Sequence, residues 1–163
     1  MNFVPLEKAR MKLAIVWLGG GAVIILILVL QSLLHRYVDP VSGDLTQEAW
    51  GWLMPTILPT LGMIVTVLGY TALDPNDSKS IVRQSFLTLA LSLSVFYVLL
   101  VLLTILIQPF ASRNASDAIG LMRTSNLWLG PVQGLVASAL GVLFVSKEKK
   151  DPAPPTPGIP GKP

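Results

Sequence analysis

Residues 13–34 read LAIVWLGGGAVIILILVLQSLL, twenty-two consecutive positions without Asp, Glu, Lys or Arg. A helix needs about 20 mostly apolar residues to cross the hydrocarbon core of a bilayer. Three further stretches have a similar length and the same lack of charge: residues 53–73, 86–107 and 127–145. The sequence therefore predicts an all-α integral membrane protein, a bundle of four transmembrane helices joined by short loops.

The composition of the whole chain agrees with this class. Of 163 residues, 52% are hydrophobic and 13% are charged, whereas an ordinary soluble domain has about 25% charged residues. The first apolar stretch is longer than the core of a signal peptide and precedes no small-residue cleavage motif, so we expect it to remain as a span. The chain has no cysteine, which excludes disulfides, thiolate nucleophiles and cysteine-bound metals.

Composition also divides the chain into three parts. We expect a basic N-terminal tail over residues 1–12, the membrane domain over residues 13–146 and a Lys- and Pro-rich tail over residues 147–163. The last part is rich in proline and has no apolar face, so it is predicted to be disordered. Asp-Pro-Asn-Asp at residues 74–77 is typical of a tight turn, which predicts that the second and third spans pack side by side. No internal repeat is apparent.

The basic residues predict the orientation of the spans, because Lys and Arg concentrate in cytoplasmic segments. The two tails and the second loop hold nine of the twelve basic residues. We therefore expect a multi-pass protein of a plasma or inner membrane with both termini in the cytoplasm. Six of these residues form a basic belt suited to anionic lipid headgroups, although membrane sorting alone also explains them. They are Lys8, Arg10, Lys12, Lys147, Lys149 and Lys150.

The predicted spans contain no charged residue. Proton relays, voltage sensors and intramembrane catalytic sites depend on such residues, so the sequence argues against an enzyme and against a proton-coupled transporter. We expect no metal and no cofactor. Topology explains the basic residues, so nucleic acid is not expected as a partner.

Small residues at helical spacing are the strongest pattern within the spans. Such positions let the backbone of another helix approach closely. Contact within one bundle is the favoured interpretation, and contact between subunits is the alternative. The helix-packing candidates are Gly19, Gly20, Gly21, Gly130, Gly134, Ser138 and Gly141.

Two prolines inside the spans are predicted hinges, Pro59 in the second span and Pro131 in the fourth. If the two kinked helices face each other, Thr56, Thr60 and Gln133 line a small polar cavity. The alternative, which we favour, is ordinary accommodation of proline, in which the two threonines bond the freed carbonyl groups.

The third span has a polar stripe in the half nearer its N-terminus, formed by Ser85, Thr88 and Ser92. This stripe continues as large apolar residues, so one chain cannot present a continuous polar lumen along it. A pore lined by these residues requires several copies of the chain and a hydrophobic constriction as its gate.

We expect a non-enzymatic membrane subunit that anchors or scaffolds a protein complex through helix packing and its cytoplasmic tails. Its expected partners are the lipid bilayer and either further copies of itself or another membrane or cytoplasmic protein. The alternative is a homo-oligomeric pore or membrane-perturbing effector resembling an ion channel. A small transporter ranks third because the spans hold no buried charge.

Overall fold

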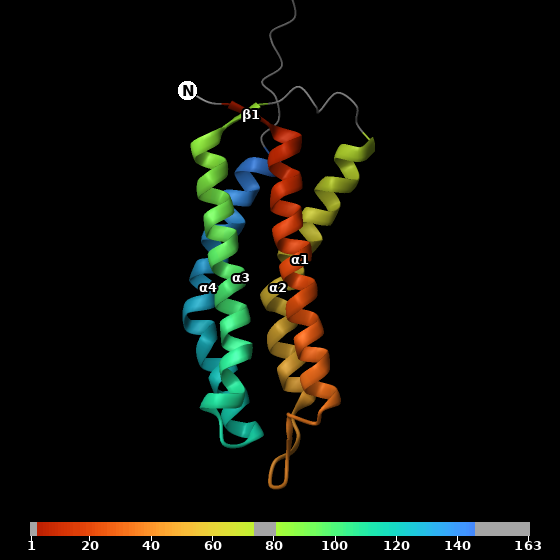
Figure 1. The fold of residues 1–163 in the computed structure, drawn as a ribbon, viewed down its shortest axis with the longest axis vertical. Helices are drawn as coiled ribbons and strands as arrows, with labels where there is room; N and C mark the ends of the chain where they lie inside the picture. The colour runs from red at the N-terminus through yellow and green to blue at the C-terminus, as the bar shows by residue number, and fades with distance from the viewer. Residues whose placement is uncertain (1–2, 74–80, 146–163) are drawn as a thin grey trace, which may run out of the picture.

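The computed structural model describes residues 3–73 and 81–145 and consists mainly of four long helices (Figure 1). These helices are α1 (Leu6–Leu33), α2 (Thr46–Leu73), α3 (Gln84–Ala111) and α4 (Ala115–Val145). All four are long and apolar enough to span a membrane. The predicted all-α class with four such helices is thereby confirmed.

Two short antiparallel strand pairs complete the described part of the chain. At the end of the bundle where α1 begins, β1 (Phe3–Pro5) pairs with β4 (Ile81–Arg83), and Val4 lies opposite Val82. At the other end, β2 (Val38–Asp39) pairs with β3 (Gly43–Asp44) in the loop between α1 and α2. We call these the strand end and the loop end of the bundle.

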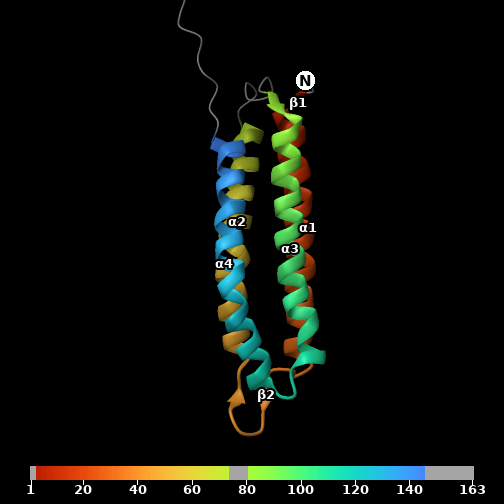
Figure 2. The same ribbon diagram turned by 90° about the vertical axis from the view of Figure 1, so that its left-hand side faces the viewer.

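The helices form two hairpins that lie side by side in the same orientation, with α1 beside α3 and α2 beside α4 (Figures 1 and 2). Consequently α2 and α3 lie diagonally opposite, and the prediction that they pack side by side is wrong. The physical reason is the β1–β4 pair, which joins the starts of α1 and α3 and so makes these two helices neighbours. The predicted turn at residues 74–77 lies outside the described residues.

The hairpins also share an order of elements that the sequence does not reveal. Each begins with a three-residue strand that leads directly into a helix of 28 residues, α1 in one half and α3 in the other. Each then returns through a second long helix. The repeat is therefore one of topology.

The helix boundaries differ from the predicted spans mainly at the strand end. The first span is predicted to begin at residue 13, but α1 begins at Leu6, so the basic residues Lys8, Arg10 and Lys12 lie on its first turns. Arg10 follows Leu6 and precedes Leu13 at helical spacing, and this stripe faces the other helices. The N-terminal tail is therefore largely part of α1.

At the loop end, α1 stops in a tight backbone reversal at His35. The backbone N–H of His35 donates to Ser32 O at 3.1 Å, and the N–H of Arg36 donates to Gln31 O at 3.0 Å. His35 has a φ of 53°, a left-handed conformation that glycine adopts easily and that a Cβ atom opposes.

Substitutions at His35 are expected to follow the steric demand of this conformation. We expect His35→Gly to be about 1–2 kcal/mol more stable than His35→Val, because a β-branched residue is strongly disfavoured at positive φ. SDS titration of the folded protein, followed by circular dichroism, measures the difference. Equal stabilities would contradict the left-handed geometry.

Candidate functional site

The predicted hinge at Pro59 brings α2 and α4 together through a polar contact. Pro59 has no N–H group, so it cannot donate to the carbonyl oxygen of Pro55 one turn earlier. Gln133 of α4 supplies a donor instead, since its Nε2 lies 3.3 Å from Pro55 O and 3.2 Å from Thr56 O. An amide from a neighbouring helix thus bonds the carbonyl that the proline leaves free.

Three further side chains belong to this group, two through hydrogen bonds and Thr60 through its buried position on the same helix as Pro59. Tyr97 of α3 donates its hydroxyl to Thr56 O at 2.9 Å, while Thr56 Oγ1 donates to Trp52 O at 2.6 Å. Thr60 is also buried. We call Thr56, Pro59, Thr60, Tyr97 and Gln133 the kink cluster. It links α2 to both α3 and α4.

The structure therefore places Thr56 and Gln133 together, as the predicted polar cavity requires, but in direct hydrogen-bonding contact. This geometry fits ordinary accommodation of proline, with one difference from expectation. Gln133 bonds the carbonyl of Pro55, whereas the hydroxyl of Thr56 bonds its own helix one turn back. Sequence reasoning missed Tyr97, because a phenol among apolar residues shows no partner until the tertiary fold brings one to it.

The polar stripe of α3 lies elsewhere. Ser85, Thr88 and Ser92 are exposed on the outside of the bundle, and Thr88 Oγ1 donates to Gln84 O of its own helix at 3.0 Å. These side chains do not meet the kink cluster. The six predicted lining residues thus form two separate sets, one inside the bundle and one on its surface.

The three glycines of α1 occupy different environments. A Cβ atom on Gly20 would lie 2.5 Å from Val98 of α3, and one on Gly21 would lie 3.1 Å from Leu61 of α2. These two glycines therefore let both neighbouring helices approach α1 closely. Gly19 faces open space.

The small residues of α4 point away from the other helices. Gly130, Gly134 and Ser138 are exposed, and a Cβ atom on either of these glycines would meet nothing within 4 Å. The same open space surrounds Gly141. Contact within one bundle, our favoured interpretation, is therefore not found at these glycines. Contact with another molecule stays a prediction.

The exposed glycines of α2 have the same property, and α2 lies beside α4. Gly51, Gly62 and Gly69 are exposed, and a Cβ atom on any of them would meet nothing within 4 Å. We call the outward surface of α2 and α4 the small-residue face. It is defined by five glycines and one serine: Gly51, Gly62, Gly69, Gly130, Gly134 and Ser138.

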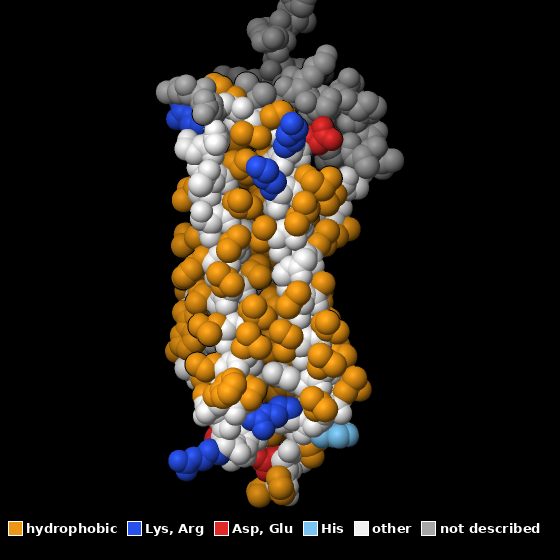
Figure 3. All heavy atoms as spheres, in the orientation of Figure 1, with side chains coloured by type: hydrophobic (Ala, Val, Ile, Leu, Met, Phe, Trp, Pro, Cys, Tyr) orange, Lys and Arg blue, Asp and Glu red, His pale blue; other side chains and the backbone are white. Residues whose placement is uncertain are grey.

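The outward surface of α1 and α3 has a different character. Among the described side chains, α1 exposes seven large hydrophobic residues and α3 eight, against two on α2 and four on α4. Figure 3 shows hydrophobic side chains along most of the length of the bundle, with basic side chains near both ends. The outward surface of α1 and α3 therefore carries more bulky apolar side chains than that of α2 and α4, which carries the exposed glycines.

The predicted basic belt is only partly visible. Lys8 and Lys12 are exposed, as contact with headgroups requires, whereas the side chain of Arg10 is 5% exposed and lies inside the bundle. Arg10 therefore does not face outward as Lys8 and Lys12 do, and headgroup contact of the belt stays a prediction. The other members, residues 147, 149 and 150, lie outside the described residues.

A second interhelical polar group lies at the loop end and was also missed. Tyr37 is fully buried, and its hydroxyl lies 2.5 Å from Gln31 Oε1 and 3.1 Å from Gln108 Oε1. Burial raises the pKa of Tyr37 above its usual value, against the opposing effect of Arg36, so the phenol stays protonated. It ties the first loop to α1 and α3.

Neither polar group contains a His, Asp or Glu side chain. Within residues 3–73 and 81–145, no three His, Asp or Glu side chains gather closely enough to hold a metal ion. Comparison with protein-family models, curated proteins and solved structures finds no match. The function must therefore be inferred from the faces and contacts of this chain.

Proposed function

We propose that this protein is a non-enzymatic, multi-pass membrane subunit that holds a partner through the small-residue face. The first support is the exposure of large apolar side chains halfway along the helices, such as Leu26 at 58% and Leu99 at 55%. Exposed apolar surface of this extent is unfavourable in water and natural in lipid. Positive-inside sorting favours cytoplasmic termini in a plasma or inner membrane.

The observation that carries the proposal is the open space above Gly130 and Gly134 on α4. In a bilayer the hydrophobic effect does not drive helices together, so they associate through close packing of backbones at small residues. The bulky side chains of α1 and α3 suit contact with lipid tails. The small-residue face instead suits a transmembrane helix of a partner, which the tails of this chain would help to retain.

We expect Gly134→Leu to reduce the complex isolated from native membranes by about tenfold or more, equivalent to roughly 1.4 kcal/mol of lost packing. The added side chain points into open space, so the fold of the single chain is not strained. The measurement is the mass and composition of the detergent-solubilised particle.

Gly19→Leu is the matched control, because Gly19 also faces open space but lies on α1. Its complex is expected to stay intact. Equal behaviour of the two variants, whether both assemble or both fail, would refute the small-residue face as the contact.

A homo-oligomeric pore is the second candidate. It is favoured by the outward position of Ser85, Thr88 and Ser92 on α3, which a ring of several copies would turn toward a lumen. The mass and composition of the detergent-solubilised particle also distinguish the pore from the scaffold. A closed ring of this chain alone favours the pore, whereas one or two copies bound to a second protein favour the scaffold.

A further inference from the structure

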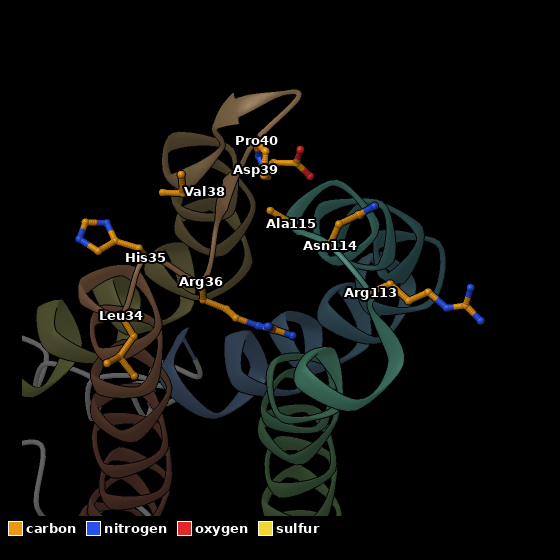
Figure 4. A pocket seen from close by; sticks show the side chains of 9 residues that line it. All are labelled: Leu34, His35, Arg36, Val38, Asp39, Pro40, Arg113, Asn114 and Ala115. Atoms are coloured by element: carbon orange, nitrogen blue, oxygen red, sulfur yellow. The ribbon is translucent and has the colours of Figure 1, made fainter.

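The loop end contains a cavity of about 300 Å³ between the first loop and the start of α4 (Figure 4). Residues 34–36 and 38–40 form one wall, and residues 113–115 form the other. In Figure 4 the side chain of Arg36 extends across the gap between the two loops, whereas His35 and Arg113 point away from it. The guanidinium of Arg36 is therefore the charged group best placed to meet a ligand.

Arg36 is half-buried and forms no ion pair or side-chain hydrogen bond within the described part of the chain. Arg123 at the same end behaves differently, because its Nη2 lies 2.6 Å from Glu48 Oε2. A guanidinium has five N–H donors, and withdrawing a cation from water without an acceptor is costly. No nitrogen of Arg36 is among the fully buried groups without a partner, so its donors stay accessible to an anionic acceptor that enters the cavity.

Asp39 is the acidic residue on the cavity wall, and its carboxylate is engaged by its own loop and by Ser116 of α4. It accepts the backbone N–H groups of Val41 at 2.8 Å and Ser42 at 3.2 Å, as well as the hydroxyl of Ser116 at 3.3 Å. These hydrogen bonds, that of Val41 foremost, hold the pKa of Asp39 below its usual value. Of the two arginines on the wall, Arg113 points away from the cavity, so the positive charge that faces a ligand is that of Arg36.

The opposite wall adds a favourable electrostatic contribution. Asn114 and Ala115 belong to the start of α4, where Asn114 Oδ1 accepts the N–H of Asp117 at 2.8 Å. The first turn of a helix carries a partial positive charge that favours anions. Asp117 opposes this charge, so Arg36 remains the principal determinant.

We propose that this cavity binds a phosphate-type oxyanion, with Arg36 as its main ligand. Arg binds phosphate oxygens through two parallel hydrogen bonds, a geometry that Lys cannot reproduce. At about 300 Å³, the cavity is large enough to admit such a group together with water molecules. Lipid headgroups lie at the ends of transmembrane helices, so the phosphate belongs either to a phospholipid or to a soluble anion that enters from the aqueous side.

The test titrates the detergent-solubilised full chain with phosphatidylglycerol and counts bound lipids by native mass spectrometry. We expect Arg36→Gln to weaken binding about tenfold or more, as for loss of a charge-assisted pair of hydrogen bonds. Arg123→Gln is the matched control, with the same change of charge at the same end, and should change binding less than about twofold.

A second arm adds inorganic phosphate alone and follows its binding by calorimetry. Binding of the lipid but not of inorganic phosphate identifies a headgroup site, and binding of inorganic phosphate identifies a site for soluble anions. Either result supports the proposal if Arg36→Gln weakens that binding about tenfold or more. Binding that Arg36→Gln leaves unchanged, or the absence of both ligands from the wild-type protein, would overturn it. Should Arg36→Gln not fold, Arg36→Lys decides, since a loss of about threefold supports the site and unchanged affinity refutes it.

Discussion

Trp17→Ala is expected to lower the free energy of unfolding by about 2–3 kcal/mol, because it empties a site of roughly 100 Å³ at a cost near 24 cal/mol per Å³. Trp17 is 1% exposed, and its ring centroid lies 5.7 Å from that of Tyr97. The transfer of the Trp17 side chain from the core to lipid on unfolding contributes little to this free energy, since lipid tails are as apolar as the core. Unfolding in mixed micelles of increasing SDS content measures the change.

Two comparison variants make this prediction specific. Trp17→Phe keeps the ring contact and removes an indole N–H that is buried without a partner, so we expect it to cost less than about 1 kcal/mol. Leu18→Ala alters a neighbouring side chain that is 42% exposed and should have little effect. A loss for Trp17→Ala no larger than that for Leu18→Ala would contradict the position of Trp17 in the core.

Gln133→Leu is expected to destabilise the fold by about 1–3 kcal/mol, because it removes the donor to the carbonyl oxygen of Pro55 at a surface where lipid tails offer no other donor. The physical cause is the missing N–H of Pro59, so the two positions should be coupled. In a Pro59→Ala background the N–H is restored to α2, and Gln133→Leu should then cost about 1 kcal/mol less. SDS unfolding of the four proteins of this double-mutant cycle gives the coupling.

Additive effects in that cycle would show that Gln133 stabilises the protein in some way other than by bonding the carbonyl freed by Pro59. Ser138→Ala is the control within α4, because the Ser138 hydroxyl donates to Gly134 O of its own helix. We expect Ser138→Ala to be nearly neutral in both the Pro59 and the Pro59→Ala backgrounds.

The candidate site was predictable from the sequence only where few side chains could supply the hydrogen-bond partner that a group needs. Proline must leave a carbonyl without its donor, and Gln133 is the polar amide well inside the fourth predicted span, so the contact between them follows from few alternatives. Tyr97 and Tyr37 were missed, because each bonds a group on a helix more than forty positions away in the chain, although Tyr37 also bonds Gln31 nearby. The sequence predicts that Arg10 lies in an N-terminal tail, because the first predicted span begins only after the last charged residue of that tail. The helix α1 in fact begins at Leu6 and includes Arg10.

The sequence by itself determined that four long helices exist and roughly where each lies. A backbone in apolar surroundings must satisfy its own hydrogen bonds, and a continuous helix does so within one segment. Uncharged stretches such as residues 13–34 therefore have little choice of secondary structure.

Only the tertiary structure decided which side of each helix meets a neighbour. Gly19 and Gly20 are adjacent in the chain, yet one faces open space and the other contacts Val98. On α4 the residues of the strongest small-residue pattern, Gly130, Gly134 and Ser138, are exposed on the outside of the bundle. A helix that is apolar all round has no polar stripe to fix its rotation, so the fit of side chains between helices sets that rotation, and this fit exists only once all four have assembled.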